Sequence, residues 1–243
     1  MTETDDDLIS AAFARRWWFA LMANAVGLIE DAAVLAGHGS PGRAQSLVVL
    51  AMEELAKARW LYTAASAQWT SPLGLYGLPP REAGPVIVPE GLRSTRRPHL
   101  EKLRVAEQFA SGLGGFWDPE RRPEYYFPAD LETFDTAARQ RNTDKQAGLY
   151  VDRAGDVLAT PLAIPPGPVA DMIEQAAQTI EMQLIEDHTR QQDAPEGAPV
   201  DSFQDLHWVI LPYAHPEMHA DFVDRLSAAD RESGQRPTRS DDS

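Results

Sequence analysis

The sequence predicts a mainly α-helical protein, an antiparallel four-helix bundle with long loops and a small β-hairpin insertion. Apolar residues recur at steps of three and four along four long segments, as they do in amphipathic helices. Stretches rich in proline and glycine separate these segments and supply the loops. Over residues 147–160 the pattern changes to two short strand-like runs around Gly155, which predicts the hairpin.

The first two predicted helices form a pair. The first covers residues 9–35, after an acidic leader over residues 1–8, and it ends at the glycines of GHGSPGR. The second covers residues 41–67 and begins with Pro41, a residue suited to the first turn of a helix. Because the connection is so short, we expect the two helices to pack antiparallel.

The later segments are less uniform. Residues 70–97 are rich in proline and glycine, which predicts an ordered loop without regular structure. A third helix is predicted from Pro98 to about Ser111, where GLGG stops it. The segment ADLETFDTAARQRN is compatible with a further helix, and a fourth strong helix is predicted over residues 169–190.

These elements indicate one helical domain over residues 9–192. Residues 193–201 resemble a linker, because they combine proline, glycine and acidic residues. Residues 202–230 predict a C-terminal helical extension. Residues 231–243 are polar and charged, which predicts a disordered tail.

Composition narrows the class of protein. The chain has no cysteine, which excludes disulfides, thiolate metal sites and a cysteine nucleophile. The N-terminus MTETDDDLIS has no basic segment followed by an apolar run, and no uninterrupted apolar segment approaches the length of a membrane span. We therefore expect a soluble cytoplasmic protein with no membrane contact.

The net charge of −15 argues against broad, nonspecific binding to nucleic acid, which depends on many unopposed cations. Basic residues nevertheless cluster in RSTRRPHLEKLR, in ERR and in RQRNTDK. Most such clusters are solvated loops that balance nearby acids. The alternative is a local basic patch for RNA, and the sequence leaves both readings open.

A polar centre is predicted in the second helix. On a helical wheel Glu54 falls in the middle of the apolar stripe, so we expect it to point into the bundle, with Lys57 at the border and Glu53 further round. A carboxylate buried there needs a partner. The third helix offers His99 and Lys102, which share its apolar face.

The first helix has two residues that suit the same centre. Asn24 and Asp31 are seven apart and border its apolar stripe on one side. Both are candidates for supporting polar groups, and both are equally compatible with ordinary surface positions.

Several segments together resemble a known family. NAVGLIEDAAVLAGHG, RAQSLVVLAMEELAKARWL, RPHLEKL and KQAGLYVD, followed by Thr160 and Pro161, are similar in order and spacing to the AbiV family of bacterial abortive-infection proteins. That family is a branch of the HEPN (higher eukaryotes and prokaryotes nucleotide-binding) helical domains. The resemblance covers Phe13 to Pro161. It implies a HEPN-like four-helix bundle, often dimeric, that acts in phage defence.

The resemblance also implies a chemistry. Many HEPN proteins are metal-independent endoribonucleases with an arginine, four to six residues, and then a histidine, supported by an acid from a neighbouring helix. Arg93 and His99 have this spacing, although Ser94 follows the arginine and Pro98 favours a loop there. The implied catalytic set is His99, Arg93, Glu54 and Lys102. Arg96, Arg97 and Lys57 form the implied phosphate-binding set, and Asn24, Asp31 and Glu53 the supporting polar set.

A non-enzymatic function remains as the alternative. It is a HEPN-like binding module that recognises a phage protein or a component of the translation machinery. Trp17 and Trp18 are adjacent on one helix and cannot both face one core, so one of them is a candidate contact for a partner or for a homodimer.

A metal site is not expected. His215 and His219 are four apart, but His207 and Glu217 are the nearest further ligands and Pro216 disturbs a helix start between the two histidines. We therefore predict neither a metal nor another cofactor.

Overall fold

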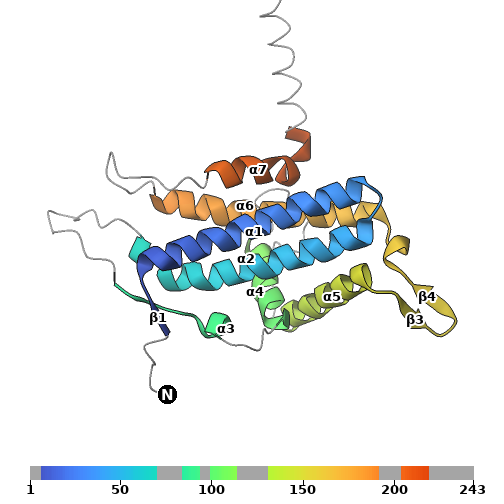
Figure 1. Ribbon diagram of the computed structural model, residues 1–243, viewed down its shortest axis with the longest axis horizontal. Helices are drawn as coiled ribbons and strands as arrows, with labels where there is room; N and C mark the ends of the chain where they lie inside the picture. Colours follow the sequence, from blue (N-terminus) through green and yellow to red (C-terminus); the bar gives the residue numbers. More distant parts are fainter. Residues whose placement is uncertain (1–6, 70–83, 94–98, 114–130, 192–203, 219–243) are drawn as a thin grey trace, which may run out of the picture.

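The structure is a computed structural model that describes residues 7–69, 84–93, 99–113, 131–191 and 204–218. Figure 1 shows two long helices, α1 and α2, in the middle of a helical body. Helices α6 and α7 lie along one side of this pair, and α4 and α5 pack against α2 from the other side. The predicted mainly α-helical class is therefore confirmed.

The first two helices form the predicted antiparallel pair. Helix α1 spans Ala11–Gly37, and its first turn is capped by Ser10, whose side chain accepts a hydrogen bond from the Phe13 amide. Gly39 adopts a φ of 75°, a conformation that glycine accepts without strain, and so turns the chain between the helices. Helix α2 spans Pro41–Trp69 and begins at the predicted proline.

The segment predicted to lack regular structure contains two short elements. Strand β2 (Val86–Ile87) pairs antiparallel with β1 (Leu8–Ile9), and α3 spans Glu90–Arg93. The prediction was therefore wrong for these residues. The cause is tertiary, because pairing with β1 satisfies backbone groups and lets Val86 pack into the core, which local composition does not encode.

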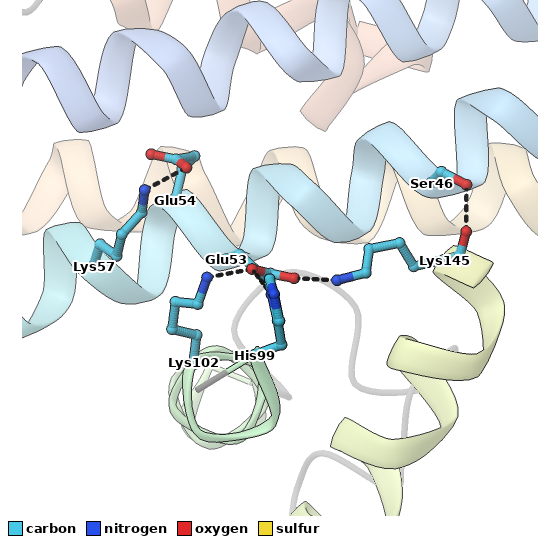
Figure 2. A network of polar contacts seen from close by, with 7 residues as sticks. All are labelled: Ser46, Glu53, Glu54, Lys57, His99, Lys102 and Lys145. Atoms are coloured by element: carbon cyan, nitrogen blue, oxygen red, sulfur yellow. Dashed lines mark hydrogen bonds and ion pairs between the residues drawn. The ribbon is translucent and has the colours of Figure 1, made fainter. Parts of the chain in front are cut away.

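Helix α4 spans His99–Gly112 and crosses α2, so that Figure 2 shows it end-on. Helix α5 spans Leu131–Leu149, longer than the segment proposed from the sequence, so the chain is still helical where the first strand of the hairpin was predicted. The hairpin itself is present. Strands β3 (Asp152–Ala154) and β4 (Val157–Ala159) pair around Gly155, whose φ is 63°.

The chain continues through a 3-10 turn, η4 (Pro161–Ala163), into α6 (Pro166–Gln191). Helix α7 (Gln204–Ala214) then packs on α6 and α1 and forms part of the predicted C-terminal extension. The proposed linker over residues 193–201 lies outside the described residues, as does the tail over 231–243. Of the acidic leader, the described part includes Leu8, which belongs to β1.

Helix α2 is the central helix of the body. It packs against α1, α4, α5 and α6, and buried side chains occur around most of its circumference. Helix α1 supplies the fully buried Trp18, Met22 and Ile29. Within the described part of the chain, α1 is also the one helix whose length and apolar composition would suffice to cross a membrane.

A charged pair joins α1 to α6. Both terminal nitrogens of Arg15 donate to the fully buried carboxylate of Asp187, at 2.8 and 2.7 Å. The guanidinium also lies 4.6 Å from the ring centroid of Trp18 and 5.1 Å from that of Trp69. A planar guanidinium can bind a carboxylate in two places and stack on aromatic rings at the same time, which fixes the relative position of the two helices.

Candidate active site

The candidate site is built around a buried carboxylate on α2. Glu53 is 2% exposed, and its two oxygens accept hydrogen bonds from three nitrogen donors (Figure 2). The donors are His99 Nδ1 at 2.7 Å, Lys145 Nζ at 2.6 Å and Lys102 Nζ. Because His99 and Lys102 lie on α4 and Lys145 lies on α5, three helices meet at this one side chain.

The acid at this centre is therefore Glu53, and the prediction that Glu54 points towards it was wrong. Glu54 is half-buried and accepts a hydrogen bond from Lys57, one turn along the same helix. Figure 2 shows this pair on the side of α2 turned away from α4. The helical wheel failed because α2 is buried on several sides, so its apolar stripe does not mark the face that α4 and α5 cover.

His99 stands at the mouth of the cluster. It is the first residue of α4, and its side chain is 51% exposed although its Nδ1 contacts the buried Glu53. An ionised carboxylate only accepts hydrogen bonds, so Nδ1 must carry the proton in this contact. The other ring nitrogen, Nε2, is then the atom that can exchange a proton with a substrate.

Lys102 lies one turn further along α4 and is buried beside Glu53. Lys145 is also buried, and it is the residue of the site that the sequence analysis missed. Its sequence neighbours put it in the basic cluster RQRNTDK, for which the sequence leaves open both a solvated loop and a local RNA patch. A signal was available, because Lys145 follows the buried Phe134 and Ala138 at helical spacing and so lies on the inner face of α5.

The end of α5 is fixed tightly against the start of α2. Gln45 and Ser46 donate side-chain hydrogen bonds to the carbonyls of Asp144 and Lys145, at 2.7 and 2.8 Å. Both carbonyls lie near the C-terminal end of α5, which ends at Leu149. A Cβ at Gly148 would lie 2.1 Å from the Gly42 carbonyl oxygen, so this close approach requires glycine. These contacts hold Lys145 where its side chain can contact Glu53 on α2.

The electrostatics favour an ionised acid and a bound anion. Burial disfavours the charged form of Glu53, but hydrogen bonds from Lys102, Lys145 and His99 outweigh burial and hold the pKa of Glu53 below its ordinary value of 4.5. One carboxylate thus faces two ammonium groups. The cluster has an excess of positive charge within a chain whose net charge is −15, and this suits a phosphate group at its mouth.

The other predicted residues lie elsewhere. Arg93 is the last residue of α3, and its guanidinium donates a hydrogen bond to the Asp7 carboxylate at 2.8 Å. It is therefore paired outside the Glu53 cluster. Asn24 and Asp31 are exposed on α1, so they occupy the surface positions that the sequence left open and do not support the buried Glu53. Arg96 and Arg97 lie outside the described residues.

The C-terminal histidines meet a carboxylate. His207 Nε2 and His215 Nε2 lie 2.8 and 2.7 Å from the two oxygens of the buried Glu181, which ties α7 to α6. Glu217 is exposed, and His219 lies outside the described residues. No group of three or more histidine, aspartate or glutamate side chains is arranged to hold a metal ion in the part of the chain that the structure describes.

A protein-family model, HEPN_AbiV, described as AbiV, matches residues 13–181. The chain belongs to the AbiV family of HEPN-like proteins. The match begins in α1 and ends in α6, so the helices that meet at Glu53 all lie inside it. No curated protein and no solved structure matches the chain.

The segments that resemble AbiV converge on the candidate site. AMEELAK supplies Glu53, PHLEKL supplies His99 and Lys102, and KQAG supplies Lys145 and the glycine that lets α5 approach α2. Residues far apart in this AbiV sequence therefore form one cluster, and the cluster combines an orienting acid, an exposed imidazole and an excess of cations.

Proposed function

We propose that this AbiV-family protein is a metal-independent endoribonuclease that acts in phage defence, with His99 as its acid–base group. The observation that carries the proposal is the hydrogen bond between His99 Nδ1 and the buried Glu53 carboxylate. It fixes one ring nitrogen on a rigid, ionised partner and leaves the other facing solvent. That arrangement is suited to proton transfer near neutral pH.

The chemistry is an internal transfer at an RNA phosphate. His99 Nε2 takes the proton of a 2′-hydroxyl as its oxygen forms a bond to the adjacent phosphorus. The bond from phosphorus to the 5′ oxygen then breaks, and the departing oxygen receives a proton from the imidazolium. The products are a 2′,3′-cyclic phosphate and a 5′-hydroxyl end, and the proton balance needs no metal.

Cations around the histidine would stabilise the negative charge that grows on the phosphate. Lys102 and Lys145 supply the excess charge beneath His99. We further propose that Arg93, Arg96 and Arg97, which precede His99 in the chain, contact the phosphates of the bound RNA. Lys57 is paired with Glu54 on another side of α2, so we leave it out of this set.

The test compares purified variants on total RNA in the presence of EDTA. His99→Ala should abolish cleavage, and Glu53→Gln should lower the rate by roughly a hundredfold or more, because the imidazole loses its orienting partner. Glu54→Gln is the matched control and should cut like the wild type. End mapping should find cyclic phosphate and 5′-hydroxyl ends. Cleavage that persists in His99→Ala, with unchanged circular dichroism, would refute the proposal.

A second candidate function is recognition of a phage protein or a translation component without catalysis. One observation favours it: large apolar side chains stand exposed on and beside the hairpin, with Val157 at 68%, Leu158 at 65% and Leu162 at 75% exposure. A two-stranded hairpin is marginally stable by itself, so a partner that covers these side chains would stabilise it. Val157→Asp should abolish such a complex and leave RNA cleavage intact.

We also propose a cytoplasmic homodimer. Trp18 is fully buried, whereas Trp17 is partly buried and its ring lies tilted beside that of the exposed Phe13, with ring centroids 6.2 Å apart. This pair of rings provides an apolar contact for a second copy. Light scattering over a dilution series should show a dimer that Phe13→Ser weakens. A wild-type chain that stays monomeric at high concentration would exclude it.

A further inference from the structure

We propose that Lys102 and Lys145 are positioning residues that keep Glu53 ionised and thereby fix the direction of its hydrogen bond to His99. The part of this inference that concerns catalysis rests on the proposed function. The part that concerns protonation stands on the geometry of Figure 2 alone.

The direction of that hydrogen bond decides whether His99 can act as a base. When Glu53 is ionised it accepts from Nδ1–H, and the lone pair of a neutral imidazole lies on Nε2, at the exposed side. When Glu53 carries a proton, its hydroxyl can donate to Nδ1 instead. The imidazole proton then lies on Nε2, and no lone pair faces a substrate.

Burial alone would favour the second state. A carboxyl group that is 2% exposed loses most of its hydration, which disfavours the ionised form. The imidazole of His99 supplies a single N–H donor, whereas the carboxylate has two oxygens. Lys102 donates to the same oxygen as His99, whereas Lys145 donates to the other oxygen, Oε1. The two ammonium groups thus cover both oxygens of the acid and supply the charge that keeps it ionised.

The composition of the chain supports a specific role for lysine. The sequence has 19 arginines and three lysines, and two of those lysines meet at Glu53. A compact ammonium on a flexible stem fits beside a buried carboxylate oxygen that is already shared, whereas a planar guanidinium needs more room. The third lysine, Lys57, lies on the same helix as Glu53 but pairs with Glu54.

The first test is a measurement on the wild-type protein. Long-range proton–nitrogen NMR distinguishes the two neutral tautomers of histidine, and the signal of His99 is assigned by its loss in His99→Ala. We expect the Nδ1–H tautomer, whereas free histidine favours Nε2–H. An Nε2–H tautomer in the wild-type protein would overturn the inference.

The second test removes the ammonium groups. Lys145→Met and, separately, Lys102→Met should shift His99 towards the Nε2–H tautomer and lower RNA cleavage by roughly a hundredfold. Lys57→Met is the matched control for the tautomer and should leave it unchanged. Circular dichroism shows which variants fold. If both folded variants retain the Nδ1–H tautomer, the inference is wrong.

Because the chain has no cysteine, the charge can be restored chemically. Lys145→Cys is alkylated with 2-bromoethylamine in denaturant and refolded, which rebuilds a lysine-like side chain at that single position. The Nδ1–H tautomer should return in the aminoethylated protein and remain absent in the unmodified Cys variant. Failure to return, in a folded product, would count against a role for the charge.

These readouts separate the inference from the proposed function. A tautomer that depends on the lysines, in a protein that cuts no RNA, upholds the positioning role and refutes the ribonuclease. RNA cleavage that continues with a lysine-independent tautomer upholds the ribonuclease and refutes the positioning role.

Discussion

Lys145 lies 92 residues beyond Glu53 in the chain, yet its Nζ is 2.6 Å from Glu53 Oε1. The contact exists because the C-terminal end of α5 is held against the first turns of α2. The charge state of the site therefore depends on how closely α5 packs against α2. Substitutions between these two helices should alter the proton transfer by His99.

Gly148→Ala tests this docking. The added Cβ would meet the Gly42 carbonyl oxygen at 2.1 Å and Ser46 Oγ at 2.2 Å, so α5 must move away, at a cost of about 1–3 kcal/mol. Chemical denaturation should report the loss. Gly27→Ala is the matched control, because nothing lies within 4 Å of its Cβ and alanine favours a helix interior by roughly 0.5–1 kcal/mol. Equal effects of the two changes would contradict the tight contact.

Glu53→Gln should destabilise the protein by about 3–5 kcal/mol, because it leaves two buried ammonium groups without their counter-charge. Urea unfolding followed by circular dichroism measures the loss. Glu54→Gln removes a half-buried pair whose two side chains are 19% and 27% exposed, and it should cost at most about 1 kcal/mol. A small effect of Glu53→Gln would mean that the three donors are solvated.

The stability supplied by Glu53 should depend on pH in one direction. Its folded-state pKa is lower than the ordinary value of 4.5, so the folded protein binds the proton less readily than the unfolded chain. The stabilisation by Glu53 is therefore fully present above about pH 4.5, and it is lost as the pH falls through the lower, folded-state pKa. The difference in unfolding free energy between wild type and Glu53→Gln should shrink on acidification. A difference that stays constant would contradict the lowered pKa.

Arg15→Lys should destabilise the protein although it keeps the charge. A lysine cannot make the two parallel bonds to Asp187 with a planar group that also lies against Trp18 and Trp69, and the lost charge-assisted hydrogen bonding is worth about 1.5–3 kcal/mol. Thermal unfolding measures the change. The neighbouring Arg16 is exposed, so Arg16→Lys should stay within about 0.5 kcal/mol. A similar result for both would show that charge alone matters at residue 15.

Sequence periodicity predicted the long helices correctly, because α1 and α2 bury apolar residues at helical spacing. It misassigned the acid for a physical reason. Helix α2 is surrounded by four other helices and buries residues in several directions. A helical wheel identifies only one of these buried faces, and for α2 that was the face turned away from α4.

The lysine from α5 was missed for a related reason. Lys145 was grouped with its charged neighbours along the chain, whereas its environment is set by residues on its own side of the helix, such as Ala138. The short β1–β2 pair was missed because its two strands are two residues each and depend on a contact between distant segments. A sequence pattern reports local preference, and both features depend on tertiary packing.

The contacts of His207 and His215 with Glu181 predict which residues should vary together in related sequences. The family match ends at residue 181, so the buried acid lies inside the matched region while His207 and His215 lie beyond it. A homologous chain that kept α7 but lacked both histidines would bury this carboxylate without a partner, which costs free energy. Selection should therefore keep the acid and the histidines together or replace all three at once, and this covariation can be sought among related bacterial sequences.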